Sequence, residues 1–170
     1  LHLGELFGDV GASYFGILAS FNGILVIVFT PFLTKITQKA RPIRVIAGGA
    51  LCYALAFGML AFTMILPLFY LSIFIMTVGE ILIAINASTF MANMTPASHR
   101  GRMSSILPLV IGTGNAVSPM VMGNYISANS IASAWIMIGT LSLLSAALMW
   151  FLQNVANKYF TPAPSNKISH

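Results

Sequence analysis

Long apolar runs separated by short polar breaks fill the chain between residues 12 and 152. A bilayer core of about 30 Å needs roughly 20 apolar residues per helix. Five runs meet this length, at 12–34, 43–64, 68–91, 103–126 and 131–152. None shows the polar face of a helix in a soluble bundle, and none alternates like the strands of a membrane barrel. The pattern predicts an all-α integral membrane protein, with about five transmembrane helices forming one lobe over residues 1–153.

The two ends of the chain do not continue this pattern. Residues 1–8 look like the end of an earlier helix, and the chain starts with Leu1 instead of Met. We therefore expect this sequence to be part of a longer protein, or a truncated product. Residues 154–170 are polar and contain two prolines, which predicts a disordered tail.

Charge adds an orientation to this picture. Hydrophobic residues make up 58% of the chain and charged residues 6%, against about 25% charged in a soluble domain. All eight Lys and Arg lie in the first connection, the third connection and the tail, at Lys35, Lys39, Arg41, Arg44, Arg100, Arg102, Lys158 and Lys167. In an alternating bundle these three segments share one side, and the positive-inside rule makes that side, with the C-terminus, cytoplasmic. The basic pI of 9.7 is thus explained by topology, and no nucleic-acid partner is expected.

Enzymatic and metal-binding patterns are not found. The single cysteine, Cys52, excludes an internal disulfide, and the three histidines are far apart in the sequence. The glycine pair Gly112 and Gly114 lies within an apolar run, where it cannot form a phosphate-binding loop. We expect no enzyme activity, no metal and no cofactor.

Glu80 is the most informative polar residue. It lies about 12 residues from either end of its run, which places it near the bilayer centre. A carboxylate at this depth usually faces a cavity, pairs with a partner or is protonated. Glu80 is therefore a candidate proton-coupling or cation-binding group, and the alternative is a structural role through hydrogen bonds to neighbouring helices. No Lys or Arg of this sequence lies at a matching depth.

Asn22 and Asn115 lie at a similar depth in the first and fourth runs. Polar side chains on separate helices at one level could line a site at the membrane midplane, where transporters hold their substrates. An interhelical hydrogen bond would explain each of them equally well. Asn86 is about 120° away from Glu80 around a helix, and we interpret it as a packing residue or a second cavity wall.

Small residues and prolines suggest close packing and bending. The spacings of Gly48 with Cys52, and of Gly112 with Ala116, fit the small-xxx-small pattern of helices in close contact. The fourth run also holds Pro108 and Pro119, which can kink a spanning helix. Such helices suit a protein that rocks between two conformations, although they also occur in static bundles.

The polar segment before the fourth run carries a recognisable motif. Residues 95–102, Thr-Pro-Ala-Ser-His-Arg-Gly-Arg, resemble the P-x-x-x-R-G-R loop between the tenth and eleventh helices of the major facilitator superfamily. Gly79-Glu80 resembles the Gly-Glu pair of the tenth helix in its drug/proton antiporter-like members. Other landmarks follow in the family's order, at Tyr14–Gly16, Asn22-Gly23, Pro31, Lys35–Arg44, Gly48-Gly49, Gly112, Gly114, Pro119 and Gly123. The basic stretch resembles a degenerate copy of the family's loop motif, because it lacks the acidic residue of the stronger copy.

The resemblance extends to about Gln153 and implies both a fold and a function. The five helices would be the eighth to twelfth of twelve, residues 1–8 would end the seventh, and the N-terminal transmembrane half would lie outside this sequence. Glu80 would face the central cavity as the coupling carboxylate, with Asn22 and Asn115 as cavity residues and Arg100, Gly101 and Arg102 as the cytoplasmic loop motif. The expected protein is a multi-pass secondary transporter of the cell membrane, of the bacterial inner membrane in particular. It would move a small organic solute by alternating access, with protons and in the efflux direction. The alternatives are an uncoupled facilitator, or a truncated half-transporter that moves nothing by itself.

Overall fold

The computed structural model describes residues 1–159, apart from the side chains of residues 94, 97, 100, 107 and 156–159. Residues 1–159 are almost entirely helical. The helices are α1 (His2–Phe7), α2 (Gly11–Thr37), α3 (Pro42–Leu60), α4 (Leu66–Met94), α5 (Arg100–Ala128) and α6 (Ile131–Tyr159), with single 3-10 turns at Gly8–Val10 and Ala97–His99. Five of them are long and apolar enough to cross a membrane, as the hydrophobic pattern predicted.

Several helix ends differ from the predicted ones by a few residues, and three of the differences change the description of a segment. Helix α3 ends at Leu60 instead of residue 64, and an extended Ile65 then leads into α4, which has a proline in its first turn. Arg100, Gly101 and Arg102 form the first turn of α5 instead of a loop. Helix α6 continues through residues 154–159, which were predicted to be tail. Residues 160–170 lie outside the described part.

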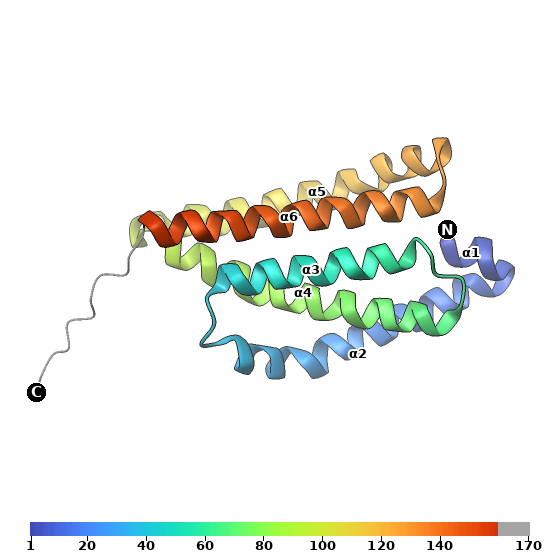
Figure 1. Cartoon of the computed structure of the whole chain (residues 1–170), viewed down its shortest axis with the longest axis horizontal. Coiled ribbons are helices and arrows are strands. Elements are labelled where there is room, and N and C mark those ends of the chain that lie inside the picture. The colour runs from blue at the N-terminus through green and yellow to red at the C-terminus, as the bar shows by residue number, and fades with distance from the viewer. Residues whose placement is uncertain (160–170) are drawn as a thin grey trace, which may run out of the picture.

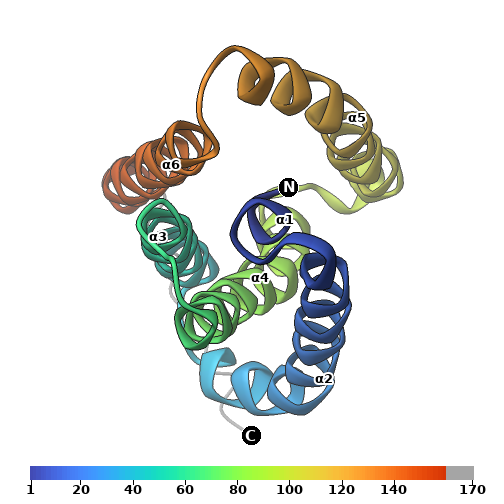
Figure 2. The same ribbon diagram turned by 90° about the vertical axis from the view of Figure 1, so that its right-hand side faces the viewer.

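The long helices run along one common axis (Figure 1). Viewed down that axis, α3 lies between α4 and α6, and α2 lies beside α4 on the opposite side from α3 (Figure 2). Helix α5 stands apart and joins the others mainly through α6 and the turn before it. The lobe therefore has a packed side around α3 and an open side along α5.

Glycines allow the packed helices to approach closely. A Cβ atom on Gly49 of α3 would lie 2.8 Å from the Gly79 carbonyl oxygen of α4, and one on Gly79 would lie 2.7 Å from the Gly49 carbonyl oxygen. On the other side of α3, a Cβ atom on Gly139 of α6 would lie 3.3 Å from the backbone nitrogen of Gly58. Small residues serve this purpose in membranes, where close van der Waals packing replaces the hydrophobic effect as the force between helices.

The close approach predicted at Gly48 is wrong by one residue. A Cβ on Gly48 would meet no described atom within 4 Å, whereas the neighbouring Gly49 lies against α4. Cys52 does belong to this contact, with its Cβ 2.9 Å from a Cβ built on Gly79. Gly112 of α5 likewise has open space around it among the described residues, because α5 is not packed against a partner at that position.

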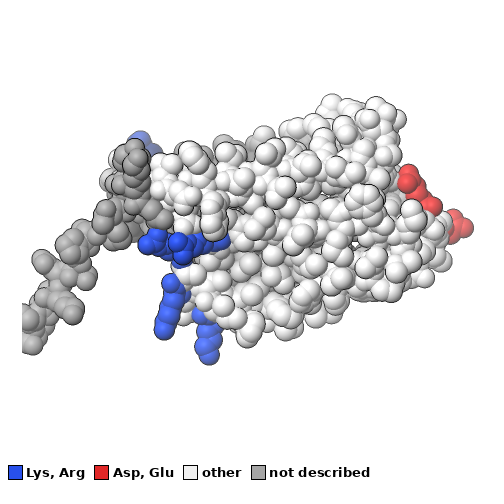
Figure 3. Space-filling view, viewed as in Figure 1, with Lys and Arg blue, Asp and Glu red and all other residues white. Residues whose placement is uncertain are grey.

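Charged side chains gather at the two ends of the bundle. Figure 3 shows Lys and Arg at one end and acidic residues at the opposite end. The basic end holds the α2–α3 connection and the start of α5, and the acidic end holds α1 with Glu5 and Asp9. The long apolar surface between the two ends is the part that would face lipid.

Candidate functional site

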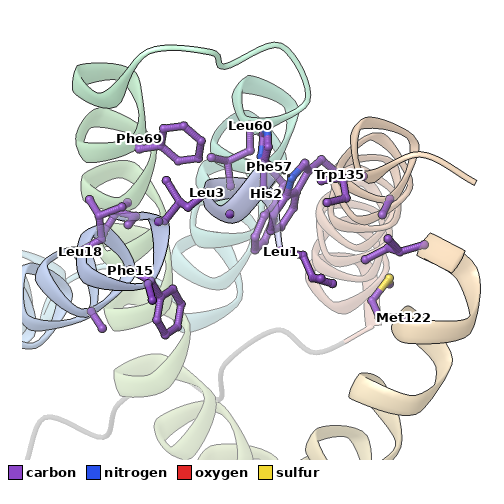
Figure 4. A pocket seen from close by; sticks show the side chains of 18 of the residues that line it. Leu1, His2, Leu3, Phe15, Leu18, Phe57, Leu60, Phe69, Met122 and Trp135 are labelled. Carbon is purple, nitrogen blue, oxygen red and sulfur yellow. Dashed lines mark hydrogen bonds between the residues drawn. The ribbon is translucent and has the colours of Figure 1, made fainter. Parts of the chain in front are cut away.

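A cavity of about 940 Å³ opens between the helices near the acidic end. All six helices contribute side chains to its wall, and Figure 4 shows the aromatic and aliphatic ones around Leu1 and Met122. Its lining is mostly apolar, and its polar side chains are His2, Asp9 and Asn22. Of the three predicted cavity residues, Glu80, Asn22 and Asn115, only Asn22 lines this cavity.

Asn22 is held by a hydrogen bond from α2 to α4. Its amide nitrogen donates to the Thr77 hydroxyl oxygen over 2.7 Å, and that hydroxyl donates to the Ile73 carbonyl oxygen over 2.7 Å. Thr77 is only 1% exposed, so the contact is sheltered from competing partners. This matches the interhelical hydrogen bond that was one of the two interpretations of Asn22. The same bond fixes the amide at the inner end of the cavity.

Glu80 lies three residues after Thr77, at the middle of the 29-residue helix α4. Its neighbour Gly79 is pressed against α3, but Glu80 itself is exposed in this lobe. Among the side chains that the structure describes, no basic residue forms an ion pair with it. On helical spacing, Glu80 continues the face of α4 that carries Ile73 and Met76, both in the cavity wall. Glu80 therefore lies about one turn further along the same open face, just outside the cavity.

Asn115 occupies a corresponding position on α5. It is exposed and lies near the middle of this 29-residue helix. On helical spacing it shares a face with Met122 and Ile126, which belong to the cavity wall. Glu80 and Asn115 thus lie on the same faces of α4 and α5 as the lining residues, but outside the cavity. Both are near the middle of their helices, at similar distances from the acidic end. Among the described residues, no hydrogen bond joins Asn115 to Glu80 or to the pair formed by Asn22 and Thr77.

The motif Arg100, Gly101 and Arg102 lies at the basic end of the bundle. The His99 amide donates to the Pro96 carbonyl oxygen over 2.9 Å, which closes the turn before α5. Arg102 and Gly101 are exposed. Two arginines in the first turn of a helix lie at the positive end of the helix dipole, where positive charges are unfavourable. Their position therefore favours a role at the membrane surface over one in helix stability.

Two polar contacts between helices were not predicted. With its amide oxygen turned toward Arg44, the buried Gln153 of α6 accepts from Nε at 2.6 Å and from Nη2 at 3.0 Å. At the opposite end, Trp135 Nε1 donates to His2 Nδ1 over 3.0 Å, and its ring stacks on Phe57 with centroids 5.8 Å apart. Asn86, by contrast, is buried and donates to the Leu82 carbonyl oxygen within its own helix, as a packing residue would.

A carboxylate at the middle of a membrane-spanning helix, without a cationic partner among the described side chains, can bind and release a proton or a small cation. Intramembrane carboxylates commonly mark ion pathways and proton relays for this reason. Among the described residues, the Tyr53 phenol of α3 lies within electrostatic reach of Glu80, and the hydrogen bond from Asn22 to Thr77 lies one turn before Glu80 on α4. The arrangement is suited to binding and transport of a solute or ion.

Comparison with known proteins shows the family of this chain. The profile described as Major Facilitator Superfamily matches residues 2–167. A "Na(+), Li(+), K(+)/H(+) antiporter" from Planococcus maritimus is 25% identical over 118 residues, which cover 69% of this chain and 28% of the antiporter. The "Tetracycline resistance protein, class H" from Pasteurella multocida is 28% identical over 112 residues, covering 66% of this chain and 28% of that protein. No solved structure matches the chain significantly.

The matched part of the chain thus spans a little over a quarter of the length of these curated relatives. The family match covers nearly all of it and agrees with its five spanning helices. The chain is a multi-pass membrane protein, and it belongs to the major facilitator superfamily.

Proposed function

We propose that this chain is the C-terminal lobe of a secondary transporter that couples movement of a small organic solute to protons, with Glu80 as the coupling carboxylate. The observation that carries the proposal is the placement of Glu80, unpaired among the described residues, at the middle of α4 and next to a cavity wall. Transporters hold substrates and coupling ions at this depth, at the interface between their repeats. Asn22 and Asn115 are the accompanying polar residues of the site.

Similarity to an antiporter and to a tetracycline resistance protein supports an exchange of solute or cation against protons in the efflux direction. The charge asymmetry in Figure 3 supports a cytoplasmic basic end. With the C-terminus on that side, the cavity opens toward the outer face of a cell membrane. The transport activity belongs to the complete protein, since one lobe supplies only one wall of an alternating-access site.

Substitution of Glu80 tests the coupling. In the full-length protein reconstituted in vesicles with an imposed pH gradient, Glu80→Gln should abolish uphill solute transport, because the amide cannot exchange a proton. Amounts of protein in the membrane should stay normal, since glutamine has nearly the same size and shape and Glu80 is exposed in this lobe. The matched control is Glu5→Gln, the same chemical change on an exposed residue at the acidic end, which should leave transport unchanged.

The result distinguishes coupling from its alternatives. Uphill transport that persists in Glu80→Gln would remove Glu80 from the coupling step. Wild-type transport that ignores a collapsed proton gradient would instead identify a facilitator. Uphill transport driven by a Na⁺ gradient, with no proton gradient present, would identify Na⁺ as the coupled ion.

A further inference from the structure

Two cavities follow one another along the same faces of α3, α4 and α6. The outer cavity is the one of about 940 Å³ near the acidic end, and Phe57, Met76 and Ile138 line it from these helices. A second cavity, the inner pocket, has a volume of about 260 Å³, and its wall includes Ala50, Tyr53, Ile83, Ser142 and Ser145. Ile138 belongs to both walls. The inner pocket therefore begins beside the outer cavity and lies closer to the basic end.

Glu80 lies at the junction of the two cavities. It is four residues after Met76 of the outer cavity and three residues before Ile83 of the inner pocket, so all three share one face of α4. Tyr53 approaches this point from α3, because a Cβ atom on Gly79 would lie 3.4 Å from the Tyr53 backbone nitrogen. The Tyr53 phenol is also within electrostatic reach of the Glu80 carboxylate. Both cavities thus lead to the same carboxylate.

The inner pocket is the more polar of the two. Three of its seven lining residues carry a hydroxyl, namely Tyr53, Ser142 and Ser145. Ser142 Oγ donates to the Ile138 carbonyl oxygen over 2.9 Å, which leaves its lone pairs able to accept a hydrogen bond. In the outer cavity, by contrast, the polar groups nearest Glu80 already serve each other in the bond from Asn22 to Thr77.

A stack of aromatic rings holds the Tyr53 phenol in place. The Tyr53 and Phe57 rings are 13° from parallel with centroids 5.5 Å apart, and Phe57 stacks in turn on Trp135 (Figure 4). Aromatic pairs at such separations stabilise one another beyond the area that they bury. The half-buried Tyr53 is therefore a fixed hydroxyl group at the edge of the inner pocket.

The size and the polarity of the inner pocket suit water. A water molecule occupies about 30 Å³ in the liquid and makes two to four hydrogen bonds when it is enclosed in a protein. A volume of about 260 Å³ with three hydroxyls in its wall meets both needs. We propose that the inner pocket is a water-filled route by which protons reach Glu80 from the basic end, with Tyr53 as the residue that orients the water beside the carboxylate. This route rests on the proposed coupling role of Glu80.

The step at Glu80 is a proton transfer. A hydronium ion in the inner pocket gives its proton to a carboxylate oxygen of Glu80, so that one O–H bond breaks, another forms, and a water molecule and a neutral carboxylic acid remain. Release of the proton is the reverse step. The proton and the solute therefore reach the middle of the membrane through different cavities.

Thiol modification in the full-length protein tests whether the inner pocket contains water. In a background whose native cysteines, Cys52 among them, are replaced by alanine, Ser142→Cys should react with the membrane-impermeant reagent trimethylammonioethyl methanethiosulfonate added on the side of the basic end. Ser145→Cys, in the same wall, is the second position if Ser142→Cys does not accumulate. The matched control is Leu144→Cys, which is exposed at the same depth of α6 but outside the pocket wall. It should not react, because it faces lipid.

Replacement of the phenol tests the role of Tyr53. Tyr53→Phe keeps the ring stack but removes the hydroxyl, so proton-driven uphill transport should fall about tenfold, as expected for the loss of one hydrogen bond of ordinary strength. Solute–solute exchange, which needs no net proton turnover, should fall much less. Tyr70→Phe is the matched control, since Tyr70 is half-buried on α4 against Phe21 and lies outside both cavity walls. It should leave both rates near those of the wild type.

The outcomes separate this proposal from the one on which it rests. Uphill transport that persists in Glu80→Gln would overturn both. If Glu80→Gln abolishes uphill transport, the proton route alone is overturned by an unreactive cysteine at 142 or 145 in a variant that still transports. It is also overturned by reaction only from the side of the acidic end, or by equal losses of uphill transport and exchange in Tyr53→Phe, which would make the phenol a structural group.

Discussion

Helices α3 and α5 are both apolar enough to span a membrane, but they are opposite in packing. Helix α3 has α4 and α6 in close contact, whereas α5 has few neighbours in this lobe. The difference lies in where the small residues fall. Gly49 of α3 lies against Gly79 of α4, and Gly139 of α6 lies against the backbone of α3, while Gly112 and Gly114 of α5 face open space among the described residues. Apolarity places a helix in the membrane, and small residues produce close packing only where a second helix is present to use them.

The largest effect should come from filling the α3–α4 contact. Gly49→Ala would place a Cβ 2.7 Å from Ile83 Cγ1 and 2.8 Å from the Gly79 carbonyl oxygen, so the helices must separate. Overpacking of this kind destabilises by about 1–3 kcal/mol. Thermal unfolding of the purified full-length protein should show a clear fall in Tm.

The control for this contact is the adjacent residue. Gly48→Ala makes the same change where a Cβ would have no described atom within 4 Å. It should leave Tm nearly unchanged. Equal losses in the two variants would contradict the assignment of the contact to Gly49.

A smaller effect is expected at the polar link between α2 and α4. Thr77→Val keeps the shape of the side chain but removes the acceptor for the Asn22 amide. Interhelical hydrogen bonds in membranes contribute about 0.6–2 kcal/mol, and the loss should fall in that range. The measurement is again thermal unfolding, extended to a double-mutant cycle with Asn22→Ala, in which the two losses should not add.

Thr89→Val is the matched control for this link. Thr89 is exposed on the same helix, and its hydroxyl donates only to the Ile85 carbonyl oxygen of its own helix. Its replacement should have little effect. Additive losses for Asn22→Ala and Thr77→Val would mean that the two side chains act independently.

These residues also show which features can be predicted from sequence. The five helices and the charged ends follow from hydrophobic runs and the positions of Lys and Arg, which are properties of each segment by itself. Asn22, Glu80 and Asn115 could be selected as candidates because depth in the membrane depends only on position within a helix. Their relative placement was not predictable, because the rotation of each helix about its axis depends on its neighbours.

The errors have the same origin. Gly48 and Gly49 are equivalent in sequence, and only the packing of α4 selects Gly49. Arg100, Gly101 and Arg102 look like a loop by polarity, but the backbone turn closed at His99 lets the helix begin there. The partnership of Arg44 with Gln153 joins residues more than 100 positions apart, and no local pattern indicates it.

The smallest effect is expected on α5, the weakly packed counterpart of α3. Gly112→Ala makes the same change as Gly49→Ala in a helix that packs little in this lobe. Ala favours a helix interior over Gly by up to about 1 kcal/mol, and no described atom lies within 4 Å of the new Cβ. Tm of the full-length protein should therefore stay the same or rise slightly. A fall as large as that of Gly49→Ala would show that a helix outside this chain packs against α5 at Gly112 as well, so that both helices use their glycines in the complete protein.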